Sequence, residues 1–212
     1  DGLYKKDLDK IDVLSKKRTS IVNSELATID KIYWLIEDIK RYGTLPFAGV
    51  ARAGFIAIQM LKSFVKTDII SSEEYDKFLT SLNTVSKKLS KDISSLPKDE
   101  FLAQYGHLRP GTYDITSARY DVCYERYFEN KTTSGPESED VDKCFTFSPA
   151  QMGKIDSFLE SHFIESNAKD LVSFITEAIE GRELSKFEFT KSLSLVIEYI
   201  SDLGGKYGFN RD

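Results

Sequence analysis

The residues best suited to chemistry gather in the segment YGHLRPGTYD, from Tyr105 to Asp114. It holds one of only two histidines in the chain, an arginine, a Pro-Gly pair and an acid. His107 and Arg109 stand at the expected end of a helix, beside a rigid turn, which is a place where side chains can be aimed at a ligand. The segment is therefore a candidate binding loop.

A purely structural role for the same segment fits equally well. His107 can cap the preceding helix, and Arg109 can pair with Asp114 or Asp121. Gly106 can end the helix in the left-handed conformation. Residues 109–112 have the residue types of a type II turn, in which Pro presets the first central φ and Gly supplies the positive one. The sequence leaves both hypotheses open.

Arg52 raises a parallel question because it stands in an apolar segment. Residues 47–65 are apolar almost all round, which predicts a buried central helix. A guanidinium in that setting must reach a carboxylate, a phosphate or solvent at an edge. A structural ion pair is the simpler expectation. The polar residues of this segment also argue against a membrane span.

Several common sites are missing from the sequence. It has no GxxxxGK[ST], GxGxxG, HExxH or GxSxG motif. His162 and Glu160 lack the spacing and the second set that a di-iron bundle needs. Cys123 and Cys144 form no CxxC pattern, so neither zinc nor a disulfide framework is indicated, although one disulfide between them stays open. We expect no metal and no catalytic residue within this chain.

The composition is that of a globular protein. Among the 212 residues, 41% are hydrophobic and 30% charged, and the formal net charge is -5. An acidic chain without a basic patch argues against a nucleic-acid partner. The N-terminal segment, charged from its start, is unlike a signal peptide, and its first residue is not Met, which is consistent with a piece of a longer polypeptide. We expect a cytoplasmic protein with no membrane partner.

The periodicity predicts an all-α fold, an irregular bundle of about seven or eight helices in a single domain over residues 1–212. The expected helices cover residues 8–21, 26–39, 44–65, 71–89, 97–105, 148–163, 168–180 and 184–203, and the first two could also be one long helix with a joint near residues 20–23. Thr44 is the expected N-cap of the third, after a break at Tyr42 and Gly43. Ser71 and Glu74 have the spacing of a capping box.

One excursion interrupts the helical pattern at residues 122–147. Its aromatic flanks, residues 124–128 and 145–147, have the composition of two short strands of a β-hairpin. Its polar, acidic centre predicts an exposed flexible loop at residues 129–143.

Three segments, taken in order, resemble one family. They are RYGTLPFAGVARAGFIA (Arg41 to Ala57), YGHLRPGTYDITSARYD (Tyr105 to Asp121) and GRELSKFEFTKSLS (Gly181 to Ser194). They are similar to segments of phosphoenolpyruvate synthase (pyruvate, water dikinase)-like phosphotransferases, the broad group that includes rifampicin phosphotransferase. The middle segment is the most specific, because its aromatic, Gly-His, basic, Pro-Gly and acidic residues rarely occur together in this order.

The resemblance implies an enzyme of three parts. An ATP-grasp domain takes a phosphoryl group from ATP with Mg²⁺, a swivelling domain carries it on a histidine, and a further domain presents a small-molecule acceptor. Neither His107 nor His162 lies in the small-residue-rich segment that holds the phosphohistidine. This chain then corresponds to the helical middle region, with no cofactor of its own, and its partners are the ATP-grasp and phosphohistidine domains of the same polypeptide.

The same resemblance suggests a substrate-binding set. A phosphoryl acceptor site needs cations around the transferring phosphate and a group that orients the attacking oxygen. Arg52, His107 and Arg109 are the candidate cations, and Asp114 orients them or a substrate hydroxyl. Two alternatives remain: a free-standing helical binding or scaffold module without enzymatic activity, and a 105–121 segment that only braces the helices.

Overall fold

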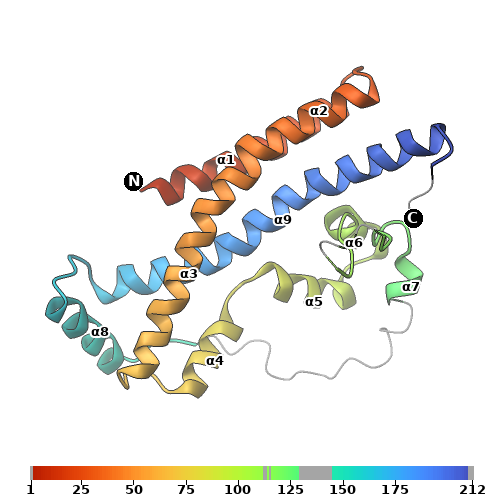
Figure 1. Cartoon of the computed structure of the whole chain (residues 1–212). Helices are drawn as coiled ribbons and strands as arrows, with labels where there is room; N and C mark the ends of the chain where they lie inside the picture. The colour runs from red at the N-terminus through yellow and green to blue at the C-terminus, as the bar shows by residue number, and fades with distance from the viewer. Residues whose placement is uncertain (1, 112–113, 115, 129–144, 210–212) are drawn as a thin grey trace. The chain divides into compact units, whose positions relative to one another are not determined.

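The computed structural model describes residues 2–111, 114, 116–128 and 145–209. In this part of the chain the regular structure is helical, and no strand occurs. The elements, labelled in Figure 1, are α1 (Leu3–Val22), α2 (Thr28–Asp38), the π-helix η1 (Ile39–Thr44), α3 (Leu45–Lys66), α4 (Ser72–Ser81), α5 (Val85–Ser95), α6 (Lys98–Tyr105), α7 (Tyr124–Phe128), α8 (Pro149–Ser161) and α9 (Ala168–Lys206). The predicted all-α class is confirmed.

The chain divides into two compact units, each made of separate stretches of sequence. Unit 1 contains Asp1–Gly49, Val85–Pro136 and Leu184–Asp212, and unit 2 contains Val50–Thr84 and Glu137–Glu183. The single domain expected over residues 1–212 stays a prediction.

Unit 1 has two hydrophobic clusters. In the first, α2 and η1 pack against the C-terminal half of α9, which runs alongside α2 in Figure 1, through Ile32, Leu35, Ile39 and Val196. In the second, Phe101 and Tyr105 of α6 pack against Phe128 of α7, with partly buried aromatic residues around them. Tyr105, Leu108 and Tyr120 of the 105–121 segment belong to the second cluster or pack against it, so the cluster holds both ends of the segment.

Unit 2 is held by aromatic packing and by helix caps. Phe147 contacts the rings of Phe64 and Phe78, with ring centroids 6.4 and 5.6 Å apart. The predicted Ser71–Glu74 capping box is present, with both reciprocal hydrogen bonds. Glu74 also accepts a hydrogen bond of 2.9 Å from Gln151 of α8, so the start of α4 is fixed to the start of α8.

The predicted break at Tyr42 and Gly43 is wrong, because α2 continues through η1 into α3. The Leu45 N–H bonds the carbonyl of Lys40, five residues back. Pro46 would clash with the carbonyl of Tyr42 in a regular α-helix, and the wider π turn removes that clash. Thr44 is therefore no N-cap. Its hydroxyl instead donates to the carbonyls of Ile39 and Lys40 within the helix, each at 3.5 Å.

Two other helix boundaries differ from the prediction. The single helix expected over residues 71–89 is two helices, α4 and α5, because Leu82 turns extended and is buried while the Asn83 N–H bonds Glu180 at 2.6 Å. The two helices expected over residues 168–180 and 184–203 are one, α9. A single Gly181 costs a helix only about 1 kcal/mol, too little to break one that packs along its length.

The expected strand at residues 124–128 is also wrong, because this stretch is the short helix α7. Tyr124, Tyr127 and Phe128 have helical spacing, and all three contact the same cluster around Phe101. That shared packing face favours a helix over an alternating strand. Residues 145–147 are described and are irregular. The loop predicted at residues 129–143, and Cys144, lie outside the described residues.

One continuous run, Thr28–Lys66, is long and apolar enough by length and composition to cross a membrane, and it is the one such run among the described residues. A core helix of a soluble protein meets the same criterion.

Candidate functional site

The 105–121 segment closes on itself at the end of α6. The Leu108 N–H bonds the carbonyl of Tyr105, and the Tyr120 N–H bonds the carbonyl of Leu108, both at 2.9 Å. The Asp121 N–H bonds the carbonyl of Gly106 at 3.1 Å. These bonds join the two ends of the segment into a closed loop.

Gly106 is required for close approach rather than for a left-handed helix end. Its φ of -56° lies in the ordinary helical region, so the predicted left-handed conformation is wrong. A Cβ at this position would lie 2.4 Å from the carbonyl oxygen of Leu102 and 3.0 Å from Cβ of Asp121. Only glycine lets Asp121 come this near to the end of α6.

His107 is half-buried against α9, and its Nε2 atom is buried. Its ring lies 4.9 Å from the ring of Phe187, and its backbone carbonyl accepts a hydrogen bond of 2.8 Å from the Ser194 hydroxyl. Burial, followed by the positive charges of Lys191, Arg119 and Arg18, lowers the pKa of His107 to about 3. His107 is therefore neutral at physiological pH and cannot act as a cation toward a phosphate.

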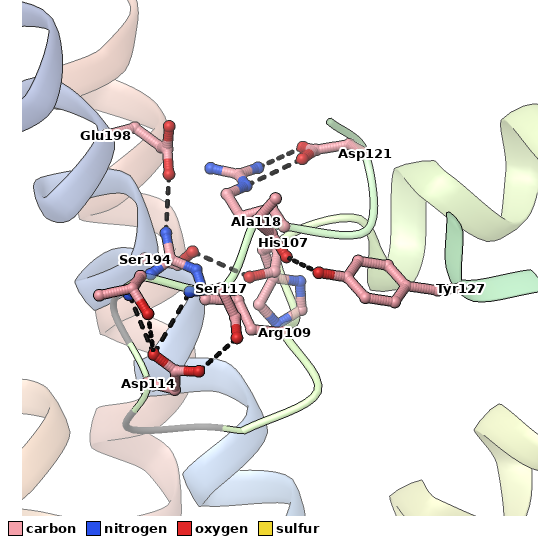
Figure 2. A network of polar contacts seen from close by, with 11 residues as sticks. His107, Arg109, Asp114, Ser117, Ala118, Asp121, Tyr127, Ser194 and Glu198 are labelled. Carbon is pink, nitrogen blue, oxygen red and sulfur yellow. Dashed lines mark hydrogen bonds and ion pairs between the residues drawn. The ribbon is translucent and has the colours of Figure 1, made fainter. Parts of the chain in front are cut away.

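Arg109 is one of the few buried charged residues among those described, with 8% of its surface exposed. It donates a hydrogen bond of 2.7 Å to Glu198 of α9 (Figure 2). The partners expected from the sequence, Asp114 and Asp121, are occupied elsewhere. Asp121 pairs with Arg119, whose Nε lies 3.0 Å from the carboxylate. The guanidinium of Arg109 thus ties the loop to α9.

Asp114 organises the loop around itself. Its carboxylate accepts hydrogen bonds from the hydroxyl and N–H of Thr116, at 2.7 and 3.0 Å, and from the hydroxyl and N–H of Ser117. Donation by the two hydroxyls is the main reason that the pKa of Asp114 falls to about 2. Asp114 is exposed, and it contacts loop residues rather than Arg109.

The turn at the tip differs from the predicted type II turn over residues 109–112. That turn needs a positive φ at Gly111, which this glycine does not have. The Asp114 N–H bonds the carbonyl of Gly111 at 3.0 Å. Thr116 and Ser117 donate hydrogen bonds to the Asp114 carboxylate. These side-chain bonds, rather than a Pro110-Gly111 turn, stabilise this part of the loop.

Arg52 lies in unit 2 and has a different environment. It is exposed, and it lines an open groove of about 460 Å³ on α3 together with Phe55, Ile56, Gln59, Met60 and Ser63. Phe55 and Ile56 are 58% and 49% exposed, so the prediction of a fully buried helix is wrong for this face. The guanidinium of Arg182, from α9, lies 4.9 Å from the ring of Phe55. The groove is therefore apolar with two arginines beside it.

The four predicted site residues divide into two groups. His107, Arg109 and Asp114 belong to one loop of unit 1, where each is bonded into the fold, while Arg52 is on the exposed groove of unit 2. Glu198 and Ser194, which hold the loop, were not among the predicted site residues. Ser194 closes the third resembling segment, which was a usable signal, whereas nothing in the sequence around Glu198 distinguishes it from other helix-surface acids.

No family model, curated protein or solved structure matches the chain. Within the described residues, no group of three or more His, Cys, Asp or Glu side chains is placed to hold a metal ion.

Proposed function

We propose that the chain is a helical acceptor-binding or linker domain of a phosphoenolpyruvate synthase-like, ATP-dependent phosphotransferase that shuttles a phosphohistidine, and that it is not catalytic alone. The proposal rests on the resemblance of three segments to that family. Its support from the structure is the way in which these segments meet.

The three segments are far apart in sequence and are in contact in the folded chain. Gly43 of the first would place a Cβ 3.0 Å from Cβ of Phe189 in the third, and the rings of Phe47 and Phe189 lie 5.1 Å apart. His107 of the second contacts Phe187 of the third. Segments that resemble one family and also contact one another in the folded chain are expected to belong together. This contact is the observation that carries the proposal.

The first and third segments also contact each other in unit 2. Gly54 of the first segment lies against Arg182 of the third, where a Cβ would be 3.0 Å from Cδ of Arg182. Arg182 then covers Phe55, next to the groove that Arg52 lines. We infer that this groove is the acceptor-side surface, because an exposed guanidinium beside apolar side chains suits a small molecule with an anionic or phosphorylated group.

The 105–121 segment has a structural role in this proposal. His107 is neutral and Arg109 is paired, so neither supplies charge to a phosphate. Arg52 is then the one exposed cation of the predicted set. The neighbouring ATP-grasp and phosphohistidine domains supply the nucleotide chemistry, with ATP and Mg²⁺.

The first test is the mass of the native gene product, measured by immunoblot with an antibody to this chain. A band much heavier than 24.1 kDa agrees with a domain of a larger enzyme. A band at that mass contradicts the proposal and favours the alternative, a free-standing helical binding or scaffold module.

The second test uses the native polypeptide that contains this chain. We expect Arg52→Ala to raise the KM for the acceptor while ATP consumption in its absence stays unchanged. Lys62→Ala is the matched control, because Lys62 is exposed on the same helix and does not line the groove. Equal effects of the two substitutions would remove the groove from the acceptor site.

A further inference from the structure

A small cavity lies between the closed loop and α9. It has a volume of about 40 Å³ and is lined by His107, Leu108, Arg109, Thr190, Leu193, Ser194 and Ile197. A cavity holds a water molecule once its volume exceeds roughly 10–15 Å³, provided that polar partners are present. The cavity is thus large enough for a water molecule.

Two buried polar atoms of the lining residues lack a protein partner. They are Nε of Arg109 and Nε2 of His107. Arg109 is more than nine-tenths buried, so its Nε–H has no route to bulk solvent. Buried polar groups of native proteins are bonded to protein or to ordered water in the great majority of cases. We therefore expect a molecule in the cavity that forms hydrogen bonds with Nε of Arg109 and Nε2 of His107.

The chemistry of the two atoms is complementary, which restricts the occupant. The backbone carbonyl of Gln104 acts on the His107 ring and favours a proton on it, which raises the pKa of His107 against the larger effect of burial. Since Nε2 has no partner, the donor to that carbonyl is Nδ1–H, and the neutral ring then presents a lone pair at Nε2. Nε of Arg109 presents an N–H donor. The occupant must accept from one atom and donate to the other.

We propose that this cavity is a binding site for a buried water molecule that accepts a hydrogen bond from Nε–H of Arg109 and donates one to Nε2 of His107. A halide or other anion fits less well, because it can only accept and would face the lone pair of the imidazole.

Two hydroxyls in the lining complete the site. The Thr190 hydroxyl donates to the carbonyl of Phe187 at 2.9 Å, and the Ser194 hydroxyl donates to the carbonyl of His107 at 2.8 Å. Each retains lone pairs that can accept the second hydrogen of the water. The water thereby joins the loop to α9 and gives the side chains of His107 and Arg109 a structural role. This inference does not depend on the proposed function of the chain.

The test is a crystal structure of the wild-type chain at a resolution that shows ordered water, from a chloride-free and a bromide-soaked crystal. We expect one density peak in the cavity, about 2.7–3.2 Å from both Nε of Arg109 and Nε2 of His107, without anomalous signal in bromide. An empty cavity, or an anomalous bromide peak in it, would overturn the proposal.

A solution measurement covers the case in which crystals are not obtained. Cross-relaxation between the Nε–H of Arg109 and water should have the sign of a long-lived bound molecule. Arg109→Lys keeps the positive charge opposite Glu198 and removes the Nε–H. The signal that is present in the wild-type spectrum and absent from that of the variant is therefore the Nε–H of Arg109. Arg52→Lys is the matched control. An Arg109 Nε–H that shows only exchange with bulk solvent would contradict the proposal.

Discussion

Arg109 and Arg52 are the same residue type in two opposite settings. Arg109 is 8% exposed, contacts Glu198 at 2.7 Å and belongs to a loop whose polar groups bond one another. Arg52 is exposed on α3, beside apolar side chains that are exposed as well. From the sequence, a structural ion pair was one of two open hypotheses for Arg109, near a Pro-Gly turn, and the simpler expectation for Arg52, in an apolar segment.

The difference teaches that local composition does not decide whether a cation is free to bind. A turn-forming segment can be folded inward when another helix offers a carboxylate, as Glu198 does. An apolar helix can leave one face uncovered. The burial of the charge, and not the residues next to it in sequence, separates a structural arginine from a candidate binding one.

The largest expected effect is the loss of stability in Arg109→Ala. Removing one partner of a buried ion pair costs about 3 kcal/mol of unfolding free energy. Arg52→Ala, the matched control on the exposed face, should stay within about 0.5 kcal/mol. Urea unfolding of both variants measures the difference. Equal stability of the two would break the comparison.

The next effect concerns the close approach at Gly106. In Gly106→Ala the new Cβ would lie 2.4 Å from a backbone oxygen, and we expect a loss of about 2 kcal/mol from overpacking. Gly153→Ala in α8 is the control, because nothing lies within 4 Å of its Cβ. That helix substitution should gain about 0.5–1 kcal/mol. A tolerated Gly106→Ala in thermal unfolding would show that the loop is not closed as described.

The pH dependence of stability tests the burial of His107. Its pKa is about 3 in the folded chain and near 6.5 when unfolded, so the unfolded state binds the proton first as the pH falls. The contribution of His107 to the free energy of unfolding is therefore fully present above pH 6.5. It declines as the pH falls toward 3, by up to about 1.4 kcal/mol per pH unit. Unfolding at pH 7 and pH 5 measures this decline.

A variant isolates the contribution of His107. His107→Gln should reduce the difference between pH 7 and pH 5, whereas His162→Gln, at an exposed histidine of unit 2, should leave it as in the wild type. An undiminished pH dependence in His107→Gln would place the ring in solvent and contradict its burial.

The smallest expected effect is that of Phe55→Ala. The ring is 58% exposed and contacts the guanidinium of Arg182, a cation–π pair worth about 0.5–1 kcal/mol at exposed sites. Thermal unfolding should show a loss in that range. A much larger loss would mean that the α3 face is part of a core, and the groove would no longer be a candidate surface.

Much of the fold could be predicted from local patterns. The capping box of Ser71 and Glu74 begins α4, and Ser148 with Pro149 begins α8, because caps and N-terminal prolines depend on neighbours within one turn. The π turn before Pro46 could not be predicted. It resolves a clash within the helix, and its Gly43 packs against Phe189, far away in sequence.

The candidate site was predicted only in part. The segment around His107 and Arg109 was recognised as unusual, and a structural ion pair of Arg109 was one of the two hypotheses for it. Its partner was missed, because Glu198 lies 89 residues away and only the packing of the loop on α9 brings the two together. The exposure of Arg52 also depends on which face of α3 the other helices of unit 2 cover.

The most direct test of the closed loop is amide hydrogen exchange of the wild-type chain at the Leu108, Tyr120 and Asp121 N–H groups, which make the bonds that close it. We expect these amides to be protected to a degree comparable with those of α9 around Ser194. Exchange at the rate of an open surface loop would contradict the structural role of the segment and restore His107 and Arg109 as candidate binding residues.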